Sequence, residues 1–515
     1  MNRMLLAICA LALGACTTLP PRDAVAPSHA LADASATPLA RVVAASRPPE
    51  AAADRSGFRL LSDPDYAFDA RIVLIEKTER TLDVQYYVLE NDAAGAPFLG
   101  ALAAAAKRGV RVRLIVDDLH VGGSDALYGA LARQPGFELR LFNPLAARGG
   151  SPGSRVLRSL HEIGRVNHRM HNKLFVADNS VSISGGRNIA AEYFMRSTTA
   201  NFIDMDVLAA GPIVQAQSAA FDRYWNSAQV YPVAQLVDAS VSRIESAPQQ
   251  VTEPSAAPTL RAKDRLGQTA VREQLATGKL ELYWATAELF TDDPAKITRS
   301  GFDNRFSGSV SERTLEVIGS ARKRVLISSP YFIPGEIGLG VMKQAERNGV
   351  TTTIVTNSLA ATDEPLVYQA YARYRDDMLK LGVNIYEIGP VLAQRSGQLG
   401  DFGTTEARLH AKMAIVDERW IYVGSMNLDG RSASYNTETG LLIDSAPMAA
   451  NFAGLVEADR FQSSYRLRLG TSGDVEWVAQ AADGSTVVHA DEPGASWTGS
   501  LKNWFLALFL HDDLL

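Results

Sequence analysis

Two stretches of the chain, HNKLFVADNSVSISGGRN (171–188) and HAKMAIVDERWIYVGSMN (410–427), repeat one pattern. In each, a histidine is followed at identical offsets by a lysine, an aspartate, a glycine and an asparagine. The matched residues are His171, Lys173, Asp178, Gly185 and Asn188, and then His410, Lys412, Asp417, Gly424 and Asn427. Five matches at fixed spacing indicate that both stretches serve one structural and chemical purpose.

The repeat extends over whole domains rather than a motif alone. Each half contains an apolar run typical of a buried strand, then a helix, a glycine and further strands. The corresponding segments are 81–89, 100–118 and 137–144 in the first half, and 324–334, 341–358 and 382–390 in the second. Strands that alternate with helices predict an α/β fold. We expect two similar mixed-sheet domains with flanking helices, related by a pseudo-twofold axis, with the active site at their interface.

Composition predicts where the parts begin and end. Residues after the first sixteen are rich in Ala, Pro and Ser without a clean period, which indicates a flexible tether. The expected division is a signal peptide with a lipobox (1–16), a tether (17–55), a first domain (56–235), a connector (236–275), a second domain (276–470) and a C-terminal tail (471–515). The tail segment SLKNWFLALFL (500–510) is too short to cross a bilayer. Core packing and contact with a membrane interface both remain open for it.

The N-terminus has the features of an export signal. A basic residue precedes a ten-residue apolar run, and Leu-Gly-Ala-Cys then ends at Cys16. This order resembles a bacterial lipobox, whose cysteine is lipidated, although an ordinary signal with a chance cysteine is the alternative. We therefore expect a lipoprotein of the bacterial envelope, anchored to the membrane on the periplasmic side. Thr17 in place of aspartate favours the outer membrane, by resemblance to lipoprotein sorting patterns.

The charge balance argues against nucleic acid as a partner. The net charge is −6 and the isoelectric point about 5.8, so no global basic field exists. Residues 148–173 form a local basic run with six Lys and Arg against one Glu. Two interpretations stay open: attraction of anionic headgroups, or a solvated helix face with Leu157, Leu160 and Ile163 turned inward.

The repeated motif suits chemistry at a phosphate. In a strand, residues two apart share a face, so each histidine presents its imidazole beside a lysine ammonium. The glycine and the asparagine that follow predict a turn whose donors approach an anion. Lysine and amide donors bind phosphate oxygens, and histidine can attack phosphorus or move a proton. Displacement of an alcohol from phosphorus needs one histidine as nucleophile and one as acid, so each copy would supply half of one active site.

No cofactor or metal is expected for this chemistry. His168 and His171 are three residues apart, but they precede a strand rather than a helix, where that spacing would align two ligands. No HExxH motif is present.

The pattern H-x-K-x4-D-x6-G-G/S-x-N, present twice, resembles the phospholipase D superfamily over about residues 58–470. The phrases RMHNKLFVADN, SGGRNIAAEYF, ELFTDDPAK (288–296) and TNSLAATDEP (356–365) resemble the C-type bacterial cardiolipin synthases. The resemblance implies a phosphatidyltransferase that joins phosphatidylglycerol to another phospholipid, such as phosphatidylethanolamine. Protein partners and oligomeric state are not implied.

The resemblance also implies roles for individual residues. His171 would form a phosphatidyl-histidine, while His410 would protonate the departing alcohol and then deprotonate the incoming one. The groups expected to hold phosphate oxygens are Lys173, Lys412, Asn188, Asn427, Gly185, Gly186, Gly424 and Ser425; Asp178 and Asp417 complete the motifs, in a catalytic or a structural role. Glu438, and either Asp204 or Asp206, are the candidates that orient the imidazoles. Ser425 replaces Gly186 in the second copy, so which histidine is the nucleophile stays open.

Other functions remain as alternatives. Hydrolysis to phosphatidic acid passes through the same covalent intermediate, and only pocket shape and water exclusion separate it from transfer. A nuclease is opposed by the acidic balance and the expected lipid anchor. A lipid-binding protein without catalysis is opposed by the intact pair of motifs.

Overall fold

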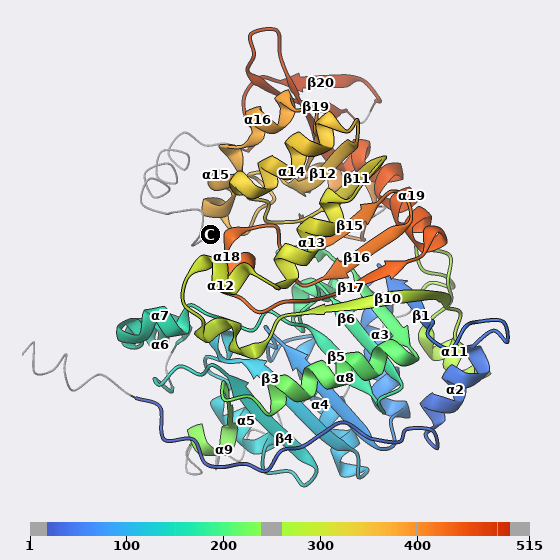
Figure 1. Ribbon diagram of the computed structural model, residues 1–515, viewed down its shortest axis with the longest axis vertical. Helices are drawn as coiled ribbons and strands as arrows, with labels where there is room; N and C mark the ends of the chain where they lie inside the picture. Colours follow the sequence, from blue (N-terminus) through green and yellow to red (C-terminus); the bar gives the residue numbers. More distant parts are fainter. Residues whose placement is uncertain (1–17, 150, 238–259, 398, 482, 495–515) are drawn as a thin grey trace, which may run out of the picture.

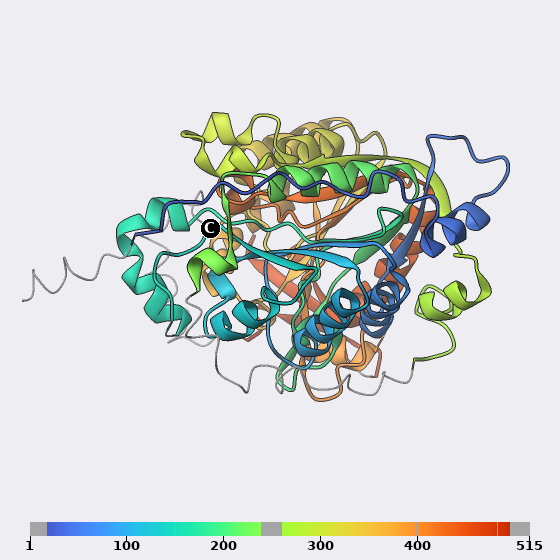
Figure 2. The same ribbon diagram turned by 90° about the horizontal axis from the view of Figure 1, so that it is seen from below.

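The computed structural model describes residues 18–149, 151–237, 260–397, 399–481 and 483–494. One mixed sheet of 18 strands runs through both halves of the described chain, with helices packed against it (Figure 1). Turning the molecule by 90° shows the sheet enclosed by helices on more than one side (Figure 2). A second, two-stranded sheet consists of β7 (Ala200–Ile203) and β14 (Glu406–Leu409).

The first half of the large sheet has the order β9-β4-β3-β2-β5-β6-β8-β1. Strands β2, β3 and β4 are parallel, and the other neighbours are antiparallel. The bounds are β1 (Ser56–Leu61), β2 (Thr81–Tyr86), β3 (Arg111–Asp117), β4 (Phe137–Phe142), β5 (Leu174–Ala177), β6 (Val181–Gly185), β8 (Asp206–Ala210) and β9 (Val230–Pro232).

The second half continues in the order β10-β17-β16-β15-β11-β12-β13-β18-β19-β20. Here β11, β12 and β13 are the parallel strands. The bounds are β10 (Tyr283–Thr291), β11 (Arg324–Ser328), β12 (Thr351–Asn357), β13 (Asn384–Ile388), β15 (Met413–Val416), β16 (Trp420–Gly424), β17 (Thr439–Asp444), β18 (Ser464–Leu469), β19 (Val475–Gln480) and β20 (Thr486–His489).

The two halves join through strands that are equivalent to each other. Strands β1 and β10 pair antiparallel, with Gly57 opposite Trp284, and from this junction the two strand orders run outward as copies of one another. Antiparallel pairing of equivalent strands is the arrangement that a twofold axis between them produces. This arrangement confirms the predicted α/β fold of two similar mixed-sheet domains.

Helices pack in the same way on both halves. In the first half α4 packs against α3 and β3, and in the second α14 packs against α13 and β12. The helices of the first half are α3 (Pro64–Lys77), α4 (Gly95–Lys107), α5 (Asp125–Leu131), α6 (Pro152–Arg158), α7 (Ile163–Val166), α8 (Pro212–Trp225) and α9 (Val233–Leu236). The helix α11 (Val271–Thr277) also packs against the first half, at α3. Those of the second half are α12 (Phe302–Phe306), α13 (Val310–Gly319), α14 (Gly335–Arg347), α15 (Pro365–Ala372), α16 (Arg375–Lys380), α17 (Pro390–Ser396), α18 (Gly430–Ser434) and α19 (Ala446–Ser463).

One hydrophobic cluster crosses the junction. It contains Met170 and Leu174 of the first half together with Leu409 and Met413 of the second, all nearly inaccessible to solvent. Burial of apolar surface on this scale makes the two halves one rigid unit around the motifs.

The expected tether is wrong for the residues that the structure describes. The segment from residue 18 crosses the first half, where Ser28 N–H donates to Asn226 (3.0 Å) and Ala30 N–H donates to Asp222 (2.9 Å). It then forms α2 (Pro38–Ser46), which Thr37 caps through a hydrogen bond from Ala40 N–H. The Thr-Pro pair at 37–38 is a helix-start signal that the Ala, Pro and Ser content obscured.

The connector and the tail also differ from their predicted limits. Asp264 in the connector forms a buried ion pair of 2.8 Å with Arg59, and α11 packs against α3, so residues 260–277 pack with the first half. Strands β19 and β20 extend the sheet of the second half into the predicted tail. Residues 1–17 and 495–515, with the signal, Cys16 and the segment 500–510, lie outside the described residues. No helix in the described part of the chain is long and apolar enough to cross a membrane.

We expect Asp264→Ala to lower the free energy of unfolding by ~3–5 kcal/mol, because the buried Arg59 guanidinium would lose its counter-charge. Urea denaturation followed by circular dichroism measures this change. The control is Asp401→Ala, whose ion pair with Arg261 is largely exposed and should contribute less than about 1 kcal/mol. Equal effects of the two substitutions would contradict a docked connector.

Candidate active site

The two motif histidines lie immediately before β5 and β15, and both are buried with their lysines. Lys173 Nζ donates to the carbonyl oxygen of His171, and Lys412 Nζ donates to that of His410, both at 2.6 Å. The exposed fractions of these four residues are between 1 and 6%. The sequence thus places an ammonium and an imidazole side by side in each half, as the two-residue offset predicts.

Each histidine is held by the backbone of the opposite half. His171 N–H donates to Thr437 O at 2.9 Å, and His410 N–H donates to Ile203 O at 2.8 Å. The second contact continues the parallel pairing of β7 with β14, which ends at Ile203 opposite Leu409. A bridge between Met170 and Thr437 repeats this pairing for the first histidine. The same cross-connection therefore occurs twice, once on each side of the pseudo-twofold axis.

Each imidazole also forms a hydrogen bond with a carboxylate from the opposite half. Nδ1 of His171 lies 2.9 Å from Oε2 of Glu438, and Nδ1 of His410 lies 2.6 Å from Oδ2 of Asp204. Both carboxylates are fully or almost fully buried. Such a hydrogen bond fixes the ring and leaves Nε2 free for chemistry. Each acid follows one motif in the sequence but orients the histidine of the other.

Strand register explains why Asp204, and not Asp206, reaches an imidazole. Gly185 pairs with Asp206 across β6 and β8, and Gly424 pairs with Gly440 across β16 and β17. Counting back two residues makes Asp204 the equivalent of Glu438. Asp206 is instead buried against two guanidinium groups, those of Arg71 (2.9 Å) and Arg187 (3.2 Å). The candidacy of Asp206 was therefore wrong, because it faces the core.

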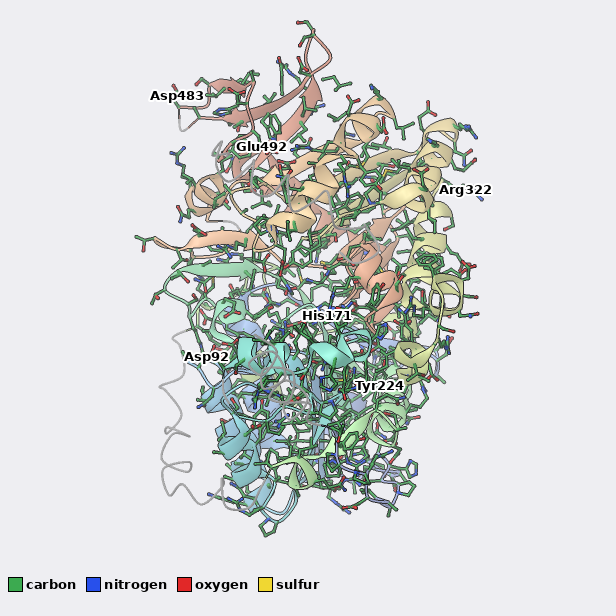
Figure 3. All side chains as sticks on the ribbon, turned by 90° about the vertical axis from the view of Figure 1, so that its left-hand side faces the viewer. Asp92, His171, Tyr224, Arg322, Asp483 and Glu492 are labelled. Atoms are coloured by element: carbon green, nitrogen blue, oxygen red, sulfur yellow. The ribbon has the colours of Figure 1, made fainter. Side chains whose placement is uncertain are left out.

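Both imidazoles meet at the junction of the halves. Figure 3 shows His171 at the level where the two halves come together. Burial, followed by the positive charges of Lys173 and Lys412 and the charge of His410, lowers the pKa of His171. Burial and Lys412 likewise lower the pKa of His410 to about 4. Each ring therefore responds to charged groups of the other half, as expected of a shared site, and both are neutral at pH 7.

The two carboxylates are not electrostatically equal. Burial raises the pKa of Glu438 to about 7, although Lys173 and the Ser425 hydroxyl oppose this. Burial also acts on Asp204, but His410, Lys412 and Arg187 outweigh it and lower its pKa to about 2. At neutral pH, Asp204 is a carboxylate, whereas Glu438 is near its titration point. The pseudo-symmetric site is thus chemically asymmetric.

Aromatic rings surround both histidines. The Tyr87 ring lies 5.0 Å from His171, and the rings of Tyr193 and Phe202 lie 5.0 and 4.9 Å from His410.

One aromatic contact recurs in both halves. Lys173 Nζ lies 5.2 Å from the centre of the Tyr87 ring, and Lys412 Nζ lies 6.0 Å from that of Tyr331. The positive charge of Arg431 acts on the pKa of His171. The sequence analysis did not single out Tyr193, Phe202 or Arg431, which lie outside the repeated motif.

The motif aspartates have a structural position. Asp178 and Asp417 occupy the hairpin turns β5–β6 and β15–β16 with φ of 49° and 54°, and their carboxylates accept backbone hydrogen bonds from the segments that lead into β2 and β11. Asp178 accepts from residues 79, 80 and 81 at 2.8–3.0 Å, and Asp417 accepts from residues 322, 323 and 324. These turns lie at the far end of each strand from the histidine. We therefore correct their catalytic assignment to a structural one.

The predicted anion-binding turn is occupied by protein contacts. The N–H groups of Gly186, Gly424 and Ser425 donate to the carbonyl oxygens of Met205, Lys412 and Thr439. A side chain at Gly185 or Gly424 would collide with the neighbouring strand. These glycines allow β8 and β17 to approach closely, so their assignment to phosphate is wrong.

Two of the three remaining predicted phosphate donors also have protein partners for their side chains. Ser425 Oγ donates to Glu438 rather than pointing at a substrate. Asn188 accepts from Val88 N–H (3.1 Å) and donates to Tyr193 (2.8 Å). Asn427 differs, because its buried Oδ1 has no hydrogen-bond partner. The two lysines are the phosphate ligands that the geometry leaves best placed.

One interpretation of the basic run is wrong, because Leu157, Leu160 and Ile163 do not turn inward but are 68, 50 and 52% exposed. Three of its arginines pair within the fold, since Arg148 and Arg155 bind Asp118 and Arg169 binds Asp117. Attraction of anionic headgroups stays a prediction.

The arrangement fits an in-line displacement at phosphorus. Two neutral imidazoles with free Nε2 atoms can act as nucleophile and, once protonated, as acid, while two buried ammonium groups neutralise the phosphate. Among the described residues, no group of three or more His, Cys, Asp or Glu is placed to bind a metal ion.

Comparison with known proteins identifies the family. Residues 72–225 and 314–460 match the family described as "Cardiolipin synthase, PLD-like domain", one match in each half. Cardiolipin synthase C of Escherichia coli (strain K12) is 37% identical over 437 residues, which cover 84% of this chain and 90% of that protein. The chain belongs to this family of the phospholipase D superfamily. It is an enzyme of the phospholipase D-type phosphatidyltransferase kind and acts on phospholipids.

Two more distant matches extend the comparison. Cardiolipin synthase A of Pseudomonas putida (strain GB-1) is 26% identical over 428 residues, covering 82% of this chain and 72% of that protein. The crystal structure of phosphatidylserine synthase from Haemophilus influenzae Rd KW20 superposes with a TM-score of 0.52 at 13% identity, covering 88% of this chain and 92% of that chain. This second likeness shows the shared fold alone.

For this phospholipase D-like enzyme, we expect Asp178→Ala to lower the free energy of unfolding by about 3 kcal/mol or more, because three backbone donors would lose their acceptor. Asp178→Asn should cost less, since its remaining oxygen can still accept from residues 80 and 81. Urea denaturation measures both, and turnover per folded molecule should stay near that of the wild type. Loss of turnover in a stable Asp178→Asn protein would return this aspartate to the catalytic set.

We expect Ser425→Gly to move the acidic limb of the pH profile upward by about one pH unit. The Ser425 hydroxyl stabilises the ionised form of Glu438, so its removal raises the pKa of Glu438 above about 7. Activity that needs the carboxylate is then lost at a higher pH as the solution is acidified. The measurement is kcat/KM for bis(p-nitrophenyl) phosphate against pH. Ser425→Thr retains a hydroxyl, so its acidic limb should lie at the same pH as that of the wild type. An acidic limb of Ser425→Gly that also coincides with that of the wild type would contradict the role of Glu438.

Proposed function

We propose that this enzyme transfers a phosphatidyl group from one phospholipid to a hydroxyl of phosphatidylglycerol, which makes cardiolipin. The observation that carries this proposal is the exchanged pair of imidazole–carboxylate contacts, His171 with Glu438 and His410 with Asp204, in one buried site. Similarity to cardiolipin synthase C over most of both chains supports the choice of product.

In the first step, Nε2 of His171 attacks phosphorus and forms the N–P bond of a phosphatidyl-histidine. The bond from phosphorus to the headgroup oxygen breaks, and His410 gives that oxygen its proton. The ionised Asp204 supports His410 as the acid, because a fixed carboxylate stabilises the imidazolium form. A bound phosphate diester adds a negative charge that favours protonation of His410. Lys173 and Lys412 neutralise the nonbridging oxygens.

In the second step, His410 takes the proton of the incoming hydroxyl, whose oxygen attacks phosphorus. The N–P bond breaks and leaves His171 neutral, so the enzyme returns to its first state. Because the leaving and the incoming oxygens both lie opposite His171, one side of the site handles both headgroups.

The charges around that side suit phosphatidylethanolamine as the donor. The negative charge of Asp363 acts on Tyr193, Tyr331 and Lys412, which lie on the His410 side, and Tyr331 donates to Asp363 at 2.8 Å. Carboxylates there can accept the ammonium group of a departing ethanolamine. The positive Arg431 lies on the His171 side instead. This division favours ethanolamine as the leaving group over a second glycerol.

Hydrolysis to phosphatidic acid is the alternative, since water can replace the incoming hydroxyl without any change of residue. Cleavage of nucleic acid is less favoured by a net charge of −6. We further propose that Cys16 is lipidated after export, so that the enzyme acts on the periplasmic side of a membrane, with the outer membrane favoured. Mass spectrometry of the mature N-terminus tests this part independently.

The test of function is lipid mass spectrometry after incubation of the enzyme with vesicles. Vesicles of phosphatidylglycerol and phosphatidylethanolamine should give cardiolipin and free ethanolamine, while phosphatidylglycerol alone should give less cardiolipin. Phosphatidic acid as the sole product would favour hydrolysis, and no change in either lipid would overturn the proposal.

We expect His171→Ala and His410→Ala each to lower turnover by at least about 10³-fold, with the double variant little worse, because the two rings act on one phosphorus. Melting temperatures near that of the wild type exclude unfolding as the cause. The variants also separate the roles: trapped phosphatidyl-enzyme should be detectable by intact-protein mass spectrometry in His410→Ala and absent in His171→Ala. Near-normal turnover in either variant would end the two-histidine scheme.

A further inference from the structure

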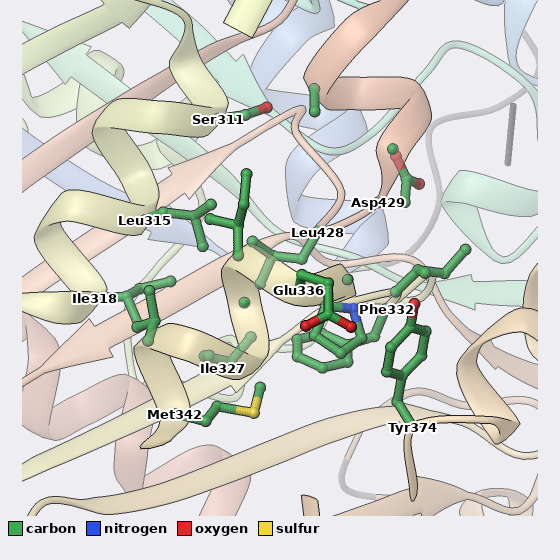
Figure 4. A pocket seen from close by; sticks show the side chains of 18 of the residues that line it. Ser311, Leu315, Ile318, Ile327, Phe332, Glu336, Met342, Tyr374, Leu428 and Asp429 are labelled. Carbon is green, nitrogen blue, oxygen red and sulfur yellow. The ribbon is translucent and has the colours of Figure 1, made fainter. Parts of the chain in front are cut away.

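A large apolar cavity of about 450 Å³ lies in the second half, between α12, α13, α14 and the sheet. Figure 4 shows side chains from these elements gathered around it. Its apolar walls include Leu315, Ile318, Ile327, Phe332, Met342 and Leu428. Its size is within the usual range for small-molecule sites, ~300–1,000 Å³.

At one wall of the cavity, a glycine of the second half stands where the first half has a buried aromatic ring. Phe98 is the fourth residue of α4 and is fully buried, with its ring 6.0 Å from Tyr86 and 6.4 Å from Phe175. The fourth residue of α14 is Gly338, which lines the cavity. The second residue of β5 is Phe175, whereas the second residue of β15 is Ala414.

The third ring is lost in the same way. Gln85 pairs with Leu174, and Ser328 pairs with Met413 in the equivalent register. Tyr86 therefore corresponds to Ser329. Three rings of the first half are thus a glycine, an alanine and a serine in the second. Gly338 lines the cavity itself, whereas Ser329 and Ala414 line a small neighbouring pocket of about 10 Å³. The core of the second half is therefore less completely filled than a packed core normally is.

The cavity borders the second catalytic motif. Asn427, Leu428, Asp429 and Gly430, the end of that motif and the residues after it, form one wall. Asn427 is the motif residue whose buried Oδ1 has no partner. Ile337, which also lines the cavity, is 46% exposed, so the apolar surface reaches the outside of the molecule.

The lining disfavours an anionic ligand. Among the described residues that line the cavity, none is Lys, Arg or His, and Glu336 and Asp429 are the acidic ones. Burial raises the pKa of Asp429 to about 7, which reduces its charge at neutral pH. A phosphate would find no counter-charge here, whereas hydrocarbon would make contacts with the apolar walls.

We propose that this cavity binds one acyl chain of the phospholipid whose phosphorus lies between the two histidines. The assignment rests on the proposed function for the identity of the substrate, and it adds where its hydrocarbon lies. In the first half the buried ring of Phe98 stands where Gly338 lines the cavity, so the difference between the halves gives one chain of the phosphatidyl group a fixed place and sets the orientation of the substrate.

The test fills the cavity and compares substrates with and without long chains. Val341 lines the cavity, and Val341→Trp places a large ring inside it. The matched control is Val391→Trp, at a residue of α17 that is 52% exposed and lies outside the cavity. Steady-state rates are measured with dioleoyl and dihexanoyl phosphatidylethanolamine, each with phosphatidylglycerol in mixed micelles, and with bis(p-nitrophenyl) phosphate, which has no acyl chain.

For Val341→Trp we expect kcat/KM for the dioleoyl substrate to fall at least about tenfold, the change expected when about two methylene groups lose their burial. The value for bis(p-nitrophenyl) phosphate should stay within about twofold of the wild type, and Val391→Trp should change neither. An unchanged ratio between the dioleoyl substrate and bis(p-nitrophenyl) phosphate in Val341→Trp would overturn the proposal.

A second measurement needs no turnover and no variant. Vesicles containing phosphatidylethanolamine with a diazirine at the middle of one acyl chain are irradiated with the wild-type enzyme, and labelled peptides are mapped by mass spectrometry. Labels should fall on residues 310–319 and 335–347. Labels confined to other segments would contradict the cavity assignment. If the cavity peptides are labelled but no lipid is turned over, the acyl-chain site is supported and the proposed function is overturned.

Discussion

The catalytic arrangement depends on one exchanged interaction: each motif histidine is oriented by a carboxylate that belongs to the other copy. Neither half has a complete imidazole–carboxylate pair, since Glu438 reaches His171 and Asp204 reaches His410. The backbone bonds to Thr437 and Ile203 repeat the exchange one residue earlier. Separation of the halves would therefore break both pairs together, which explains why the junction is a continuous sheet and a shared hydrophobic core rather than a hinge.

The contacts between the halves also explain how several charged groups can be buried in the junction. Two ammonium groups and two acids lie within the junction, and a buried charge without a partner would cost several kcal/mol. Lys173 is stabilised by Glu438, and Lys412 by Asp204. Burial nevertheless lowers the pKa of both lysines and of both histidines. A phosphate diester would bring the negative charge that these groups lack, so the site is arranged for an anion.

Much of this could be read from the sequence, because the repeat encodes both the fold and the position of the histidines. The exchange of partners could not, since spacing within one motif says nothing of the other half. Asp204 and Asp206 are equal in sequence, and the register of β6 with β8 alone separates them. The repeat also misled: Asp178 and Asp417 recur because the same hairpin turn needs them twice. The segment from residue 18 was misjudged because its bonds to Asp222 and Asn226 connect residues almost 200 positions apart.

The differences between the copies are coordinated rather than random. A side-chain carbon at Gly186 would lie 2.1 Å from Oδ1 of Asp204, so the aspartate carboxylate occupies the space that the Ser425 side chain fills in the other copy. Glu438 and Ser425, a longer acid and a hydroxyl, thus correspond to Asp204 and Gly186, a shorter acid and a glycine. The pKa of Glu438 is near neutrality, whereas Asp204 is ionised. A reaction in which one histidine bonds to phosphorus and the other moves a proton needs this inequality, and a strictly symmetric site would provide two equal bases and no committed acid.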